Sequence, residues 1–502
     1  MKAIGIDIGI KNICGILINA KTGALEKSVT FNNDSFIHYQ HSFQKVQEIR
    51  KIVNIVDKIL ESIPLEDVSA IGLTGQMHGM LYVDKNGNAA SSLFTYQDGR
   101  GDLPYKNTTY AKYLGSYSGY GNVTDFYNRE NDLRPKRAVT YCTIADYIAM
   151  KLCGLKEPCI HESNAASFGN YNIETMTFDY DFSPKITNGY TIIGEYKGIP
   201  VSVAIGDNQA SVFSTLIDED DVLVSVGTES RVSMISQYPI ECTDHETRPY
   251  FDNKYLIVGT SLGGGRIYTL LKDFYKDIVR NFTEVSDDEI YSYMNSTPIN
   301  LQHTLMIESR FAGTRQRPEL TGNIHNIKFD NFTPENLTSS LLDALSGELF
   351  CLYFMDVGLK KNGLIGIGNG IRKNPALVKY LENRFKTVMK IPVHVEEAAF
   401  GAALYALISA GIFKNAEEAQ KIVKFRSNEN ASSFELKIGE RLASLRKLNG
   451  ITQTELAEML SISNSAISKW ETGQGYPDIN FLPKLASVFN VTVDFLLGYD
   501  NT

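Results

Sequence analysis

Cysteine is scarce in this sequence, and the few cysteines that occur show no pattern that builds a site. Six of the 502 residues are cysteine: Cys14, Cys142, Cys153, Cys159, Cys242 and Cys351. They form no C-x-x-C pair and no cluster with histidine, which are the spacings that indicate zinc sites and disulfide frameworks. We therefore expect neither kind of site, and we expect reduced thiols in the cytoplasm.

Long apolar runs and targeting signals are also lacking. The most apolar stretch, residues 398–413, has 16 residues between Glu397 and Lys414, whereas a bilayer span needs about 20. The chain enters a strand-like pattern directly after Lys2, without the basic, apolar and cleavage regions of a signal peptide. The sequence therefore predicts a buried core helix at 398–413, a cytoplasmic location and no membrane contact.

The chain has no excess of basic charge. Lys and Arg together number 49 against 58 Asp and Glu, a net charge of −9, which excludes nucleic acid as a polyelectrolyte partner of the whole chain. Any DNA contact must therefore be local. What is present is a globular composition, 43% hydrophobic and 21% charged, and a length that predicts about three domains.

Two segments that lie far apart in the chain share one pattern. Residues 2–19 and 221–236 each form an apolar strand, a Gly-bearing polar turn and a second apolar strand. The turns lie around Asp7 and Gly9 in the first segment and around Gly227 and Thr228 in the second. Helical patterns follow both, at 46–63 and 337–357. The repeat predicts two similar α/β halves, with a chance likeness of two hairpins as the alternative.

A glycine-rich turn closes the second half. Residues 363–374 (GLIGIGNGIRKN) place glycines between an apolar strand and a helical pattern at 375–389. Free backbone N–H groups in such a turn cradle phosphate, although tight turns alone use the same residues. Residues 424–433 are polar and poor in apolar side chains, which predicts a linker.

After the linker the pattern changes to short helices. Ile438, Leu442 and Leu445 form an apolar stripe, and Thr452 and Glu455 have capping-box spacing at the start of the next helix. A tight turn precedes another short helix, on which four polar residues are expected to face outward: Asn464, Ser465, Ser468 and Lys469. Two short helices around a tight turn are the layout of a helix-turn-helix.

Residues 436–499 closely resemble the Cro/C1 (Xre) family of five-helix DNA-binding domains, through TQTELAEMLSISNSAISKWETG and PDINFLPKLASVFNVTVDFLLG. The resemblance implies that those four residues contact bases in the major groove of double-stranded DNA, that Gln453 contacts a phosphate, and that the protein is a homodimer. Residues 435–502 carry six Lys and Arg against eight Asp and Glu, so operator contact would rest on a small patch. A helix bundle used only for protein contacts or dimerisation is the alternative.

Two polar loops in the first half carry groups that can hold a small ligand. The motif TGQMHG follows an apolar strand at 70–73 and presents Gln76, Met77 and His78 at its end. The motif TYQDGR presents Asp98 and Arg100, which can grip vicinal hydroxyls. The plainer alternatives are a structural histidine and a surface ion pair.

Two aspartates are the candidates for chemistry. Asp207 follows the strand that leads into GDNQASV, where a rigidly held carboxylate can accept a proton from an attacking hydroxyl. Asp7 lies beside a Gly turn that faces phosphate, where its charge requires a cation, and we expect Mg²⁺ there. For Asp7 the alternative is an exposed turn aspartate.

Together these motifs resemble the FGGY carbohydrate kinases, and within them the sedoheptulokinase-like members, from residue 2 to about residue 413. Besides TGQMHG, TYQDGR and GDNQASV, the resemblance rests on IADYIAMKLCGLKEPCIHESNAASFG and EEAAFGAAL. It implies an α/β fold of two duplicated actin-like ATPase (ribonuclease H-like) domains, followed by the all-α five-helix domain. The implied ranges are 1–213 for the sugar domain, 214–424 for the nucleotide domain, 425–434 for the linker and 435–502 for the helix-turn-helix domain.

The family resemblance also implies a reaction and its residues. It implies transfer of the γ-phosphoryl group of ATP to a terminal hydroxyl of a ketose, with Asp207 as general base and with Mg²⁺ held by Asp7 and Asp207. The residues implied to line the sugar site are Gln76, Met77, His78, Asp98, Arg100 and Asn208. Those implied to contact the nucleotide are Gly9, Lys11, Gly227, Thr228, Gly263, Gly264, Gly368, Gly370 and Asn374.

Three motifs depart from the family pattern. The first phosphate loop, normally Asp-x-Gly-Thr followed by Thr or Ser, has Ile10 and Lys11 where hydroxyls are usual. Thr314 replaces the Glu of a usual Gly-Glu-Arg, and Tyr96 replaces a usual Trp. Lost phosphate hydrogen bonds cost about two decades of rate or more. Because Asp7 and Asp207 are retained, an active kinase with an attached regulator is the first hypothesis. Because of these departures, a sugar-sensing transcriptional regulator with a weak or inactive kinase-like part is the second.

Overall fold

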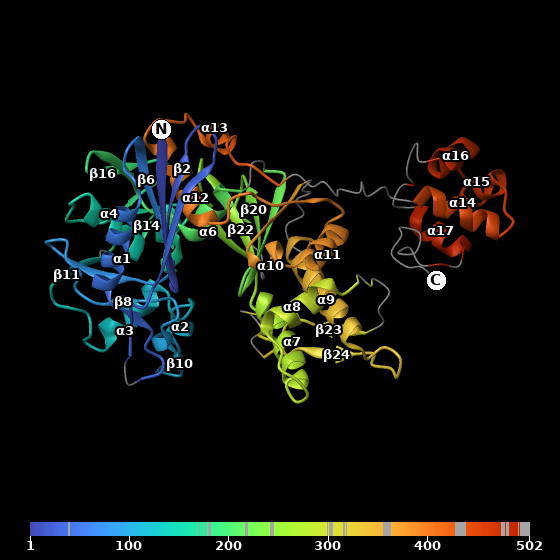
Figure 1. Ribbon diagram of the computed structural model, residues 1–502, viewed down its shortest axis with the longest axis horizontal. Helices are drawn as coiled ribbons and strands as arrows, with labels where there is room; N and C mark the ends of the chain where they lie inside the picture. Colours follow the sequence, from blue (N-terminus) through green and yellow to red (C-terminus); the bar gives the residue numbers. More distant parts are fainter. Residues whose placement is uncertain are drawn as a thin grey trace.

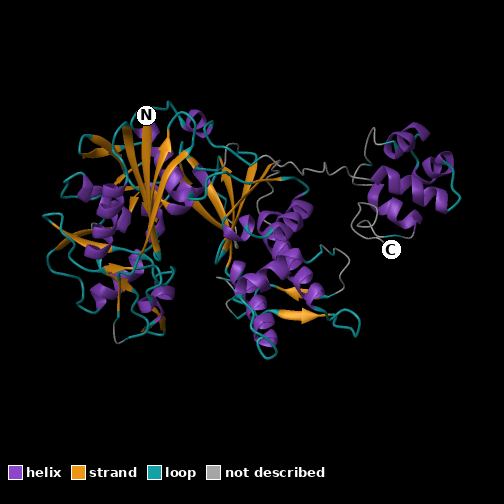
Figure 2. Ribbon diagram, in the orientation of Figure 1, coloured by secondary structure: helices purple, strands orange, loops and turns teal. Residues whose placement is uncertain are grey.

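The computed structural model describes residues 1–38, 41–169, 171–175, 177–178, 182–215, 219–240, 245–298, 300, 305–314, 317, 319–354, 363–426, 438–472, 477, 481–489 and 491. Two β-sheets with their covering helices and a separate group of helices make up these residues (Figure 1 and Figure 2).

The first sheet has the strand order β16-β17-β6-β1-β2-β3, and β18 also pairs with β6. β1 runs antiparallel to β2 and parallel to β6, and β18 runs parallel to β6. The strands are β1 (Lys2–Ile8), β2 (Asn12–Asn19), β3 (Leu25–Asn32), β6 (Val68–Gly75), β16 (Ile192–Tyr196), β17 (Ile199–Ser202) and β18 (Ile205–Gly206). The carboxyl ends of the parallel strands β1, β6 and β18 therefore meet at one edge of the sheet.

The second sheet repeats this arrangement in the order β21-β22-β20-β19-β25-β26. β19 runs antiparallel to β20 and parallel to β25, and β20 runs antiparallel to β22. The strands are β19 (Asp221–Val226), β20 (Ser230–Ser236), β21 (His245–Tyr250), β22 (Lys254–Ser261), β25 (Gly363–Ile367) and β26 (Met389–Lys390). Both predicted hairpins are present in equivalent places, which confirms the prediction of two similar α/β halves.

Helices and short strands surround the two sheets. The helices are α1 (Ile49–Ser62), α2 (Tyr110–Tyr113), α3 (Gly121–Glu130), α4 (Ile144–Leu152), α5 (Glu162–Ala165), α6 (Asp207–Phe213), α7 (Gly264–Val279), α8 (Asp287–Ser296), α9 (Pro334–Phe354), α10 (Asn369–Arg372), α11 (Pro375–Phe385), α12 (Glu397–Ser409) and α13 (Ala416–Gln420), with 3-10 turns η1 (Gly99–Asp102) and η2 (Ala166–Phe168). The short strands are β4 (Phe36–Ile37), β5 (Val46–Gln47), β7 (Leu81–Asp84), β8 (Leu93–Phe94), β9 (Pro104–Tyr105), β10 (Thr108–Thr109), β11 (Ala138–Cys142), β12 (Cys159–His161), β13 (Tyr171–Asn172), β14 (Thr177–Phe178), β15 (Lys185–Thr187), β23 (Met306–Glu308) and β24 (Asn323–His325).

Strand β1 shows how the first sheet is layered. Ile4 and Ile6 are fully buried in a core that includes the apolar face of α1. Ala3 belongs to a different core, which includes α12, and Gly5 lies directly against that helix. Because successive strand residues point to opposite faces, Asp7 lies on the same face as Ala3 and Gly5.

Helix α12 lies between the two sheets beside α6 (Figure 1). It packs so closely on the first sheet that a Cβ atom added to Gly5 would lie 1.8 Å from the Ala399 carbonyl oxygen, and one on Gly72 would lie 1.9 Å from that of Ala402. Only glycine permits this approach. Residues near the end of the second half thus complete the core of the first.

Two predicted helices begin or end elsewhere. Within 46–63, the first residues form β5, because they pair with β4 and β8 before the chain turns into α1. Within 375–389, helix α11 ends at Phe385, because Lys386 adopts a left-handed conformation and the chain then enters β26.

The predicted core helix at 398–413 is α12, which ends at Ser409 ahead of Gly411 with its φ of +73°. In the part of the chain that the structure describes, no helix is both long and apolar enough to cross a membrane. The predicted helix at 337–357 is α9, with 355–357 outside the described residues. Most of the predicted linker, from 427 onward, also lies outside them.

The C-terminal helices form a small core of their own. They are α14 (Ile438–Leu448), α15 (Gln453–Leu460), α16 (Asn464–Glu471) and α17 (Leu482–Phe489). Leu442, Leu456, Ile467 and Trp470 meet in this core, and the predicted capping box at the start of α15 is present. A fifth helix, which the resemblance implies, would fall after 491, outside the described residues.

Candidate functional site

The two candidate aspartates line one cavity of about 230 Å³ between the sheets. Asp7 comes from β1, and Asp207 is the first residue of α6, directly after β18. Strands β1 and β18 both pair in parallel with β6, so their carboxyl ends lie close together. The other lining residues are Asn208, Ser211, Leu223, Ser225, Arg231, Ser233, Ile367, Glu396, Glu397 and Ala398.

The carboxylates in this cavity repel one another. Burial, with smaller contributions from Asp207 and Glu396, raises the pKa of Asp7 to about 7. Burial also raises the pKa of Asp207, and the nearby Arg231 and Arg248 oppose that rise. Asp7 is not the exposed turn residue that the plainer alternative supposed, because it is partly buried. A cation in this cavity would relieve the repulsion.

The donor set fits Mg²⁺ in the manner of a kinase. Among the described residues no group of three or more His, Cys, Asp and Glu side chains could hold a metal by itself. Mg²⁺ in kinases is held by one or two carboxylates together with substrate phosphates and water. Asp7 and Asp207 supply such a pair of carboxylates.

The raised pKa of Asp7 predicts a pH dependence of stability. The pKa rises from the ordinary 3.8 to about 7 on folding, so between these values the folded state holds a proton that the unfolded state has released. Without Mg²⁺, stability should therefore fall as the pH rises from about 4 to about 7. The buried Asp146 and Glu162, with pKa values of about 7, act in the same direction. In Asp7→Asn the fall should be smaller than in the wild type, as followed by thermal unfolding across this range; equal slopes would contradict the prediction.

The turn between β1 and β2 is fixed from one side. The carbonyl oxygens of Gly9 and Ile10 accept hydrogen bonds from the side chains of Asn33 and Gln47, at 2.8 and 3.0 Å. The carbonyl of Lys11 accepts one from the Asn33 backbone, and the Lys11 side chain is exposed. The turn thus keeps a defined shape although it lacks the usual hydroxyls.

Gln76 connects this turn to the predicted sugar site. Its amide nitrogen donates to Gln47 Oε1 at 2.9 Å, and Gln47 in turn donates to Ile10. The side-chain oxygen of Gln76 is buried and has no hydrogen-bond partner among the described residues. A buried acceptor without a donor is rare in proteins, so this oxygen is suited to a ligand hydroxyl.

His78 is held in an uncommon backbone conformation. Its φ is +69°, its backbone N–H donates to Ser167 Oγ, and its Nδ1 lies 2.9 Å from the Ser167 carbonyl oxygen. Its ring stacks on Tyr120 with 4.3 Å between centroids. Met77 is buried and lies against Gly206, beside Asp207. Of the three residues of TGQMHG, Met77 thus lies against the residue that precedes Asp207, and none of the three lines the aspartate cavity.

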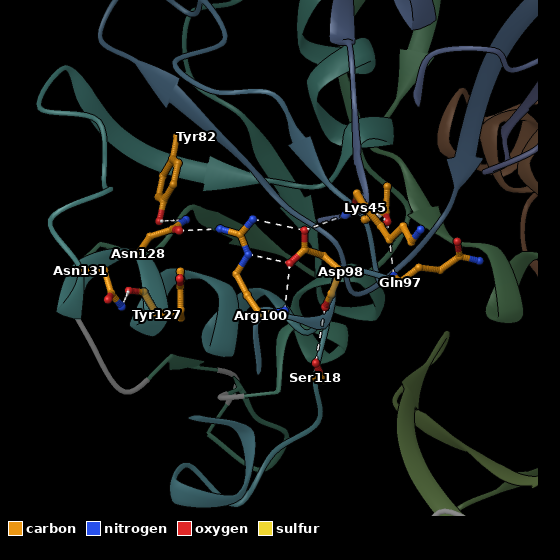
Figure 3. A network of polar contacts seen from close by, with 10 residues as sticks. Lys45, Tyr82, Gln97, Asp98, Arg100, Ser118, Tyr127, Asn128 and Asn131 are labelled. Atoms are coloured by element: carbon orange, nitrogen blue, oxygen red, sulfur yellow. Dashed lines mark hydrogen bonds and ion pairs between the residues drawn. The ribbon is translucent and has the colours of Figure 1, made fainter. Parts of the chain in front are cut away.

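Asp98 and Arg100 form a buried ion pair (Figure 3). Arg100 Nε donates to Asp98 Oδ1 at 2.6 Å, and its Nη1 donates to Asn128 at the same distance. Asp98 Oδ2 accepts from the backbone of Lys45. The alternative of a surface ion pair is wrong, because the pair is buried: the side chain of Asp98 is 0% exposed and that of Arg100 is 5% exposed. What this loop exposes is Tyr96 with its neighbour Gln97.

A larger cavity of about 1000 Å³ lies in the second half, lined by α7, α8, α10 and α11. Four of the predicted nucleotide residues line it: Gly227, Thr228, Gly370 and Asn374. Gly264 and Gly368 each adjoin a lining residue in sequence, and the Gly263 carbonyl accepts a hydrogen bond from the backbone of the lining Arg266. Gly9 and Lys11 lie in the β1–β2 turn. Sequence analysis missed Tyr268 and Tyr291, which stack with 6.1 Å between their centroids in the wall of this cavity.

Other missed residues surround the aspartates. Arg231, Arg248 and Glu396 act on the charge of Asp7 and Asp207. Arg231 could have been predicted from the sequence, because it follows the turn of the second hairpin. That turn is the counterpart of the turn beside Asp7. Arg248 and Glu396 carry no such signal.

The helix-turn-helix presents the predicted surface. Asn464, Ser465 and Lys469 are exposed on α16, and Ser468 is partly exposed, while Ile467 and Trp470 are buried. Gln453 at the start of α15 donates to Glu471 Oε2 at 2.8 Å. Glu471 also forms an ion pair with Arg446 at 2.6 Å. The predicted phosphate-binding Gln453 is therefore held in place by the end of α16.

Comparison with a solved structure defines the class of this fold. The xylulose kinase of Lactobacillus acidophilus superposes with a TM-score of 0.72 at 16% identity, covering 85% of this chain and 93% of that one. The fold is therefore the actin-like (ribonuclease H-like) ATPase fold of the sugar kinases, as predicted.

Sequence comparisons specify the two parts. The family described as "FGGY family of carbohydrate kinases, N-terminal domain" matches residues 2–111, and the one described as "Helix-turn-helix" matches residues 442–496. Sedoheptulokinase of Mus musculus is 27% identical over 421 residues, covering 72% of this chain and 86% of that protein. HTH-type transcriptional activator BcrR of Enterococcus faecalis is 45% identical over 63 residues, covering 12% of this chain and 31% of that protein. The chain thus matches the FGGY N-terminal kinase domain over residues 2–111 and a helix-turn-helix domain over residues 442–496, and it is similar to sedoheptulokinases over most of its length.

Proposed function

We propose that this protein is an ATP-dependent kinase that phosphorylates a ketose, sedoheptulose-like or xylulose-like, at a terminal hydroxyl, and that it carries a DNA-binding domain. The observation that carries the proposal is the meeting of Asp7 and Asp207 in one cavity between the two sheets. The similarity to sedoheptulokinases and the large second cavity support it.

In the proposed reaction Asp207 is the general base. Its carboxylate accepts the proton of the sugar hydroxyl while the hydroxyl oxygen attacks the γ-phosphorus, and ADP leaves. Arg231 and Arg248 favour the ionised form that a base requires, because they oppose the rise that burial gives to the pKa of Asp207. Mg²⁺, when bound, would be held by Asp7 and Asp207 and would neutralise charge on the phosphates.

For the sugar we propose contacts with Gln76, Met77, His78 and Asn208. The unpartnered oxygen of Gln76 and the position of Asn208 in the aspartate cavity support this assignment. Asp98 and Arg100 remain part of the proposed site, but as the buried pair that holds its loop, because both already bond to the protein.

For the nucleotide we propose the second cavity. The nucleobase would lie near the stacked Tyr268 and Tyr291, since aromatic faces accept a flat ring. The residues proposed to contact the nucleotide are Gly227, Thr228, Gly263, Gly264, Gly368, Gly370 and Asn374, with Gly9 and Lys11 reaching the phosphates from the β1–β2 turn.

A panel of ketoses tests the kinase proposal. The full chain is incubated with MgATP and each sugar, and sugar phosphate is measured by mass spectrometry. Formation of a phosphorylated ketose above the background of a protein-free sample is expected for at least one sugar. If no ketose is phosphorylated, the kinase proposal is wrong.

A second candidate is a sugar-responsive transcriptional regulator with a weak or inactive kinase part. The observation that favours it is the β1–β2 turn, which carries Ile10 and an exposed Lys11 where the family has hydroxyls. Regulated DNA binding without sugar phosphate formation would support this candidate over the first.

DNA binding by α16 gives a testable prediction. Wild-type protein should select a specific duplex from a randomised pool. On that duplex Asn464→Ala and Ser468→Ala should each weaken binding by about 5-fold to about 100-fold in gel-shift titrations, because one good base contact is worth about 1–3 kcal/mol. The control Met459→Ala changes an exposed residue of α15 and should bind like the wild type. If no duplex is selected, the helix bundle serves another purpose.

We also propose the domain division 1–213, 214–424, 425–434 and 435–502, and a homodimer. The first boundary follows α6 and precedes β19, which opens the second sheet. A dimer would place two α16 helices on two half-sites, which suits a mildly acidic module with a small DNA-facing patch.

A further inference from the structure

Three side chains hold the short segment that leads into Asp207. The Thr74 hydroxyl donates to the Ile205 carbonyl oxygen at 2.8 Å, and Asn164 Nδ2 donates to that of Ala204 at 3.3 Å. The backbone N–H of Gly206 donates to Ser163 Oγ at 3.0 Å. The last of these bonds is the one directly beside the aspartate.

The backbone of Gly206 is closely surrounded. It pairs with Gly75 of β6 in the first sheet. A Cβ atom at this position would lie 2.6 Å from Gln209 Oε1 and 2.7 Å from Met77 Cε, so a larger residue would have to displace the ends of these two side chains. Because Gly206 has no side chain of its own, the Ser163 bond is the side-chain contact that holds this backbone directly before Asp207.

Ser163 is itself held by a buried histidine. Its hydroxyl lies 2.8 Å from His161 Nδ1, and its backbone N–H donates to the same nitrogen at 3.1 Å. Burial lowers the pKa of His161 to about 3, so the ring is neutral. Because Nδ1 accepts the backbone N–H, the ring proton is assigned to Nε2 and the Ser163 hydroxyl donates to Nδ1. A lone pair of Ser163 Oγ then remains for Gly206.

The second half of the molecule holds the histidine ring. The ring centroid of His161 lies 5.6 Å from that of Phe251, which follows β21, and 5.7 Å from that of Tyr405 on α12. A chain of contacts thus runs from these two aromatic residues through His161 and Ser163 to the start of α6.

We propose that Ser163, oriented by His161, is a positioning residue that fixes Asp207 for proton abstraction. The inference rests on the proposed function of Asp207 as the general base. It assigns a role to part of the HESNAAS segment, which sequence analysis used only to recognise the family.

The experiment compares Ser163→Ala with Ser202→Ala in the full chain. Ser163 and Ser202 are both buried serines, but the Ser202 hydroxyl has no hydrogen-bond partner in the described part of the chain. Both variants lose a buried hydroxyl, and only the first loses the bond to Gly206. Hydrogen exchange of a peptide covering residues 203–210 is measured for each protein, together with kcat and the KM values for ATP and for the sugar found in the ketose panel.

In Ser163→Ala the peptide should exchange about tenfold faster than in the wild type, because one hydrogen bond is lost. The value of kcat should fall by about 10-fold to about 100-fold, since a small misplacement of a catalytic group has an effect of that size, while KM for ATP stays within about twofold. Ser202→Ala should match the wild type in both measurements.

Equal exchange in the two variants overturns the proposal whether or not the protein is a kinase. Faster exchange with unchanged kcat also overturns it, because the segment would then move without consequence for the base. If the wild type phosphorylates no sugar, the proposed function fails separately, and hydrogen exchange alone decides whether Ser163 holds the segment.

Discussion

Replacing Asp207 with asparagine is expected to lower kcat by about 10²-fold to about 10⁴-fold, the range that a general base contributes. The amide has nearly the same shape as the carboxylate but cannot accept the proton of the sugar hydroxyl. Binding of the nucleotide base should survive, because Asp207 is not among the residues that line the cavity proposed for the nucleotide, although loss of one of the two proposed Mg²⁺ ligands should weaken the binding of MgATP. Steady-state kinetics on the best ketose and an ATP-dependent thermal shift measure the two quantities.

The control for this variant is Asp57→Asn, which changes an exposed carboxylate on α1. It should retain wild-type kcat. Turnover of Asp207→Asn within about tenfold of the wild type would contradict the assignment of Asp207 as the base.

Arg100→Met is expected to destabilise the first half by about 3–5 kcal/mol, because removing one partner of a buried ion pair leaves a buried charge uncompensated. The methionine keeps much of the side-chain volume but removes the bonds to Asp98 and Asn128. Asp98 then retains only backbone donors, from Lys45 and from residue 100 itself.

Urea unfolding followed by circular dichroism measures this loss, and Arg129→Met is its control. Arg129 pairs with Glu130 at 3.9 Å with half of its side chain exposed, and such surface pairs are worth about 0–1 kcal/mol. The fluorescence of Trp470, the single tryptophan, should show an unchanged transition of the C-terminal helices in both variants. Equal losses in Arg100→Met and Arg129→Met would contradict the buried role of this pair.

Sequence alone predicted the repeated hairpins because each strand pattern is local. The alternation of Ala3 and Gly5 with Ile4 and Ile6 already indicates a strand with two different faces. It does not show that α12 covers one of them, because that contact joins residues from opposite ends of the kinase part. Helix ends were less predictable. The predicted start of α1 was too early, because the first residues of that pattern pair with β4 and β8 as strand β5.

The candidate site was likewise predictable from the sequence only in part. Asp7 and Asp207 stand beside glycine turns and motifs, so their identity was open to sequence reasoning, and the parallel pairing of β1 and β18 with β6 explains why they meet. Two of the charges that act on them, those of Arg248 and Glu396, come near the aspartates only through the packing of the second half. The sequence also did not predict which side chains are buried. Asp98 and Arg100 have the spacing of a surface ion pair, but both side chains are buried in the protein.

The packing of α12 on the first sheet has a consequence for synthesis of the chain on the ribosome. Gly5 and Gly72 leave the ribosome early, but the helix that covers them includes Ala399 and Ala402 and is made much later. One face of the first sheet therefore stays uncovered until nearly all residues up to α12 have left the ribosome. An exposed apolar face of this kind is a target for chaperones. The helices α14–α17 come after α12 in the chain and have their own core, so they can fold only on chains in which the helix that covers the first sheet has already been made.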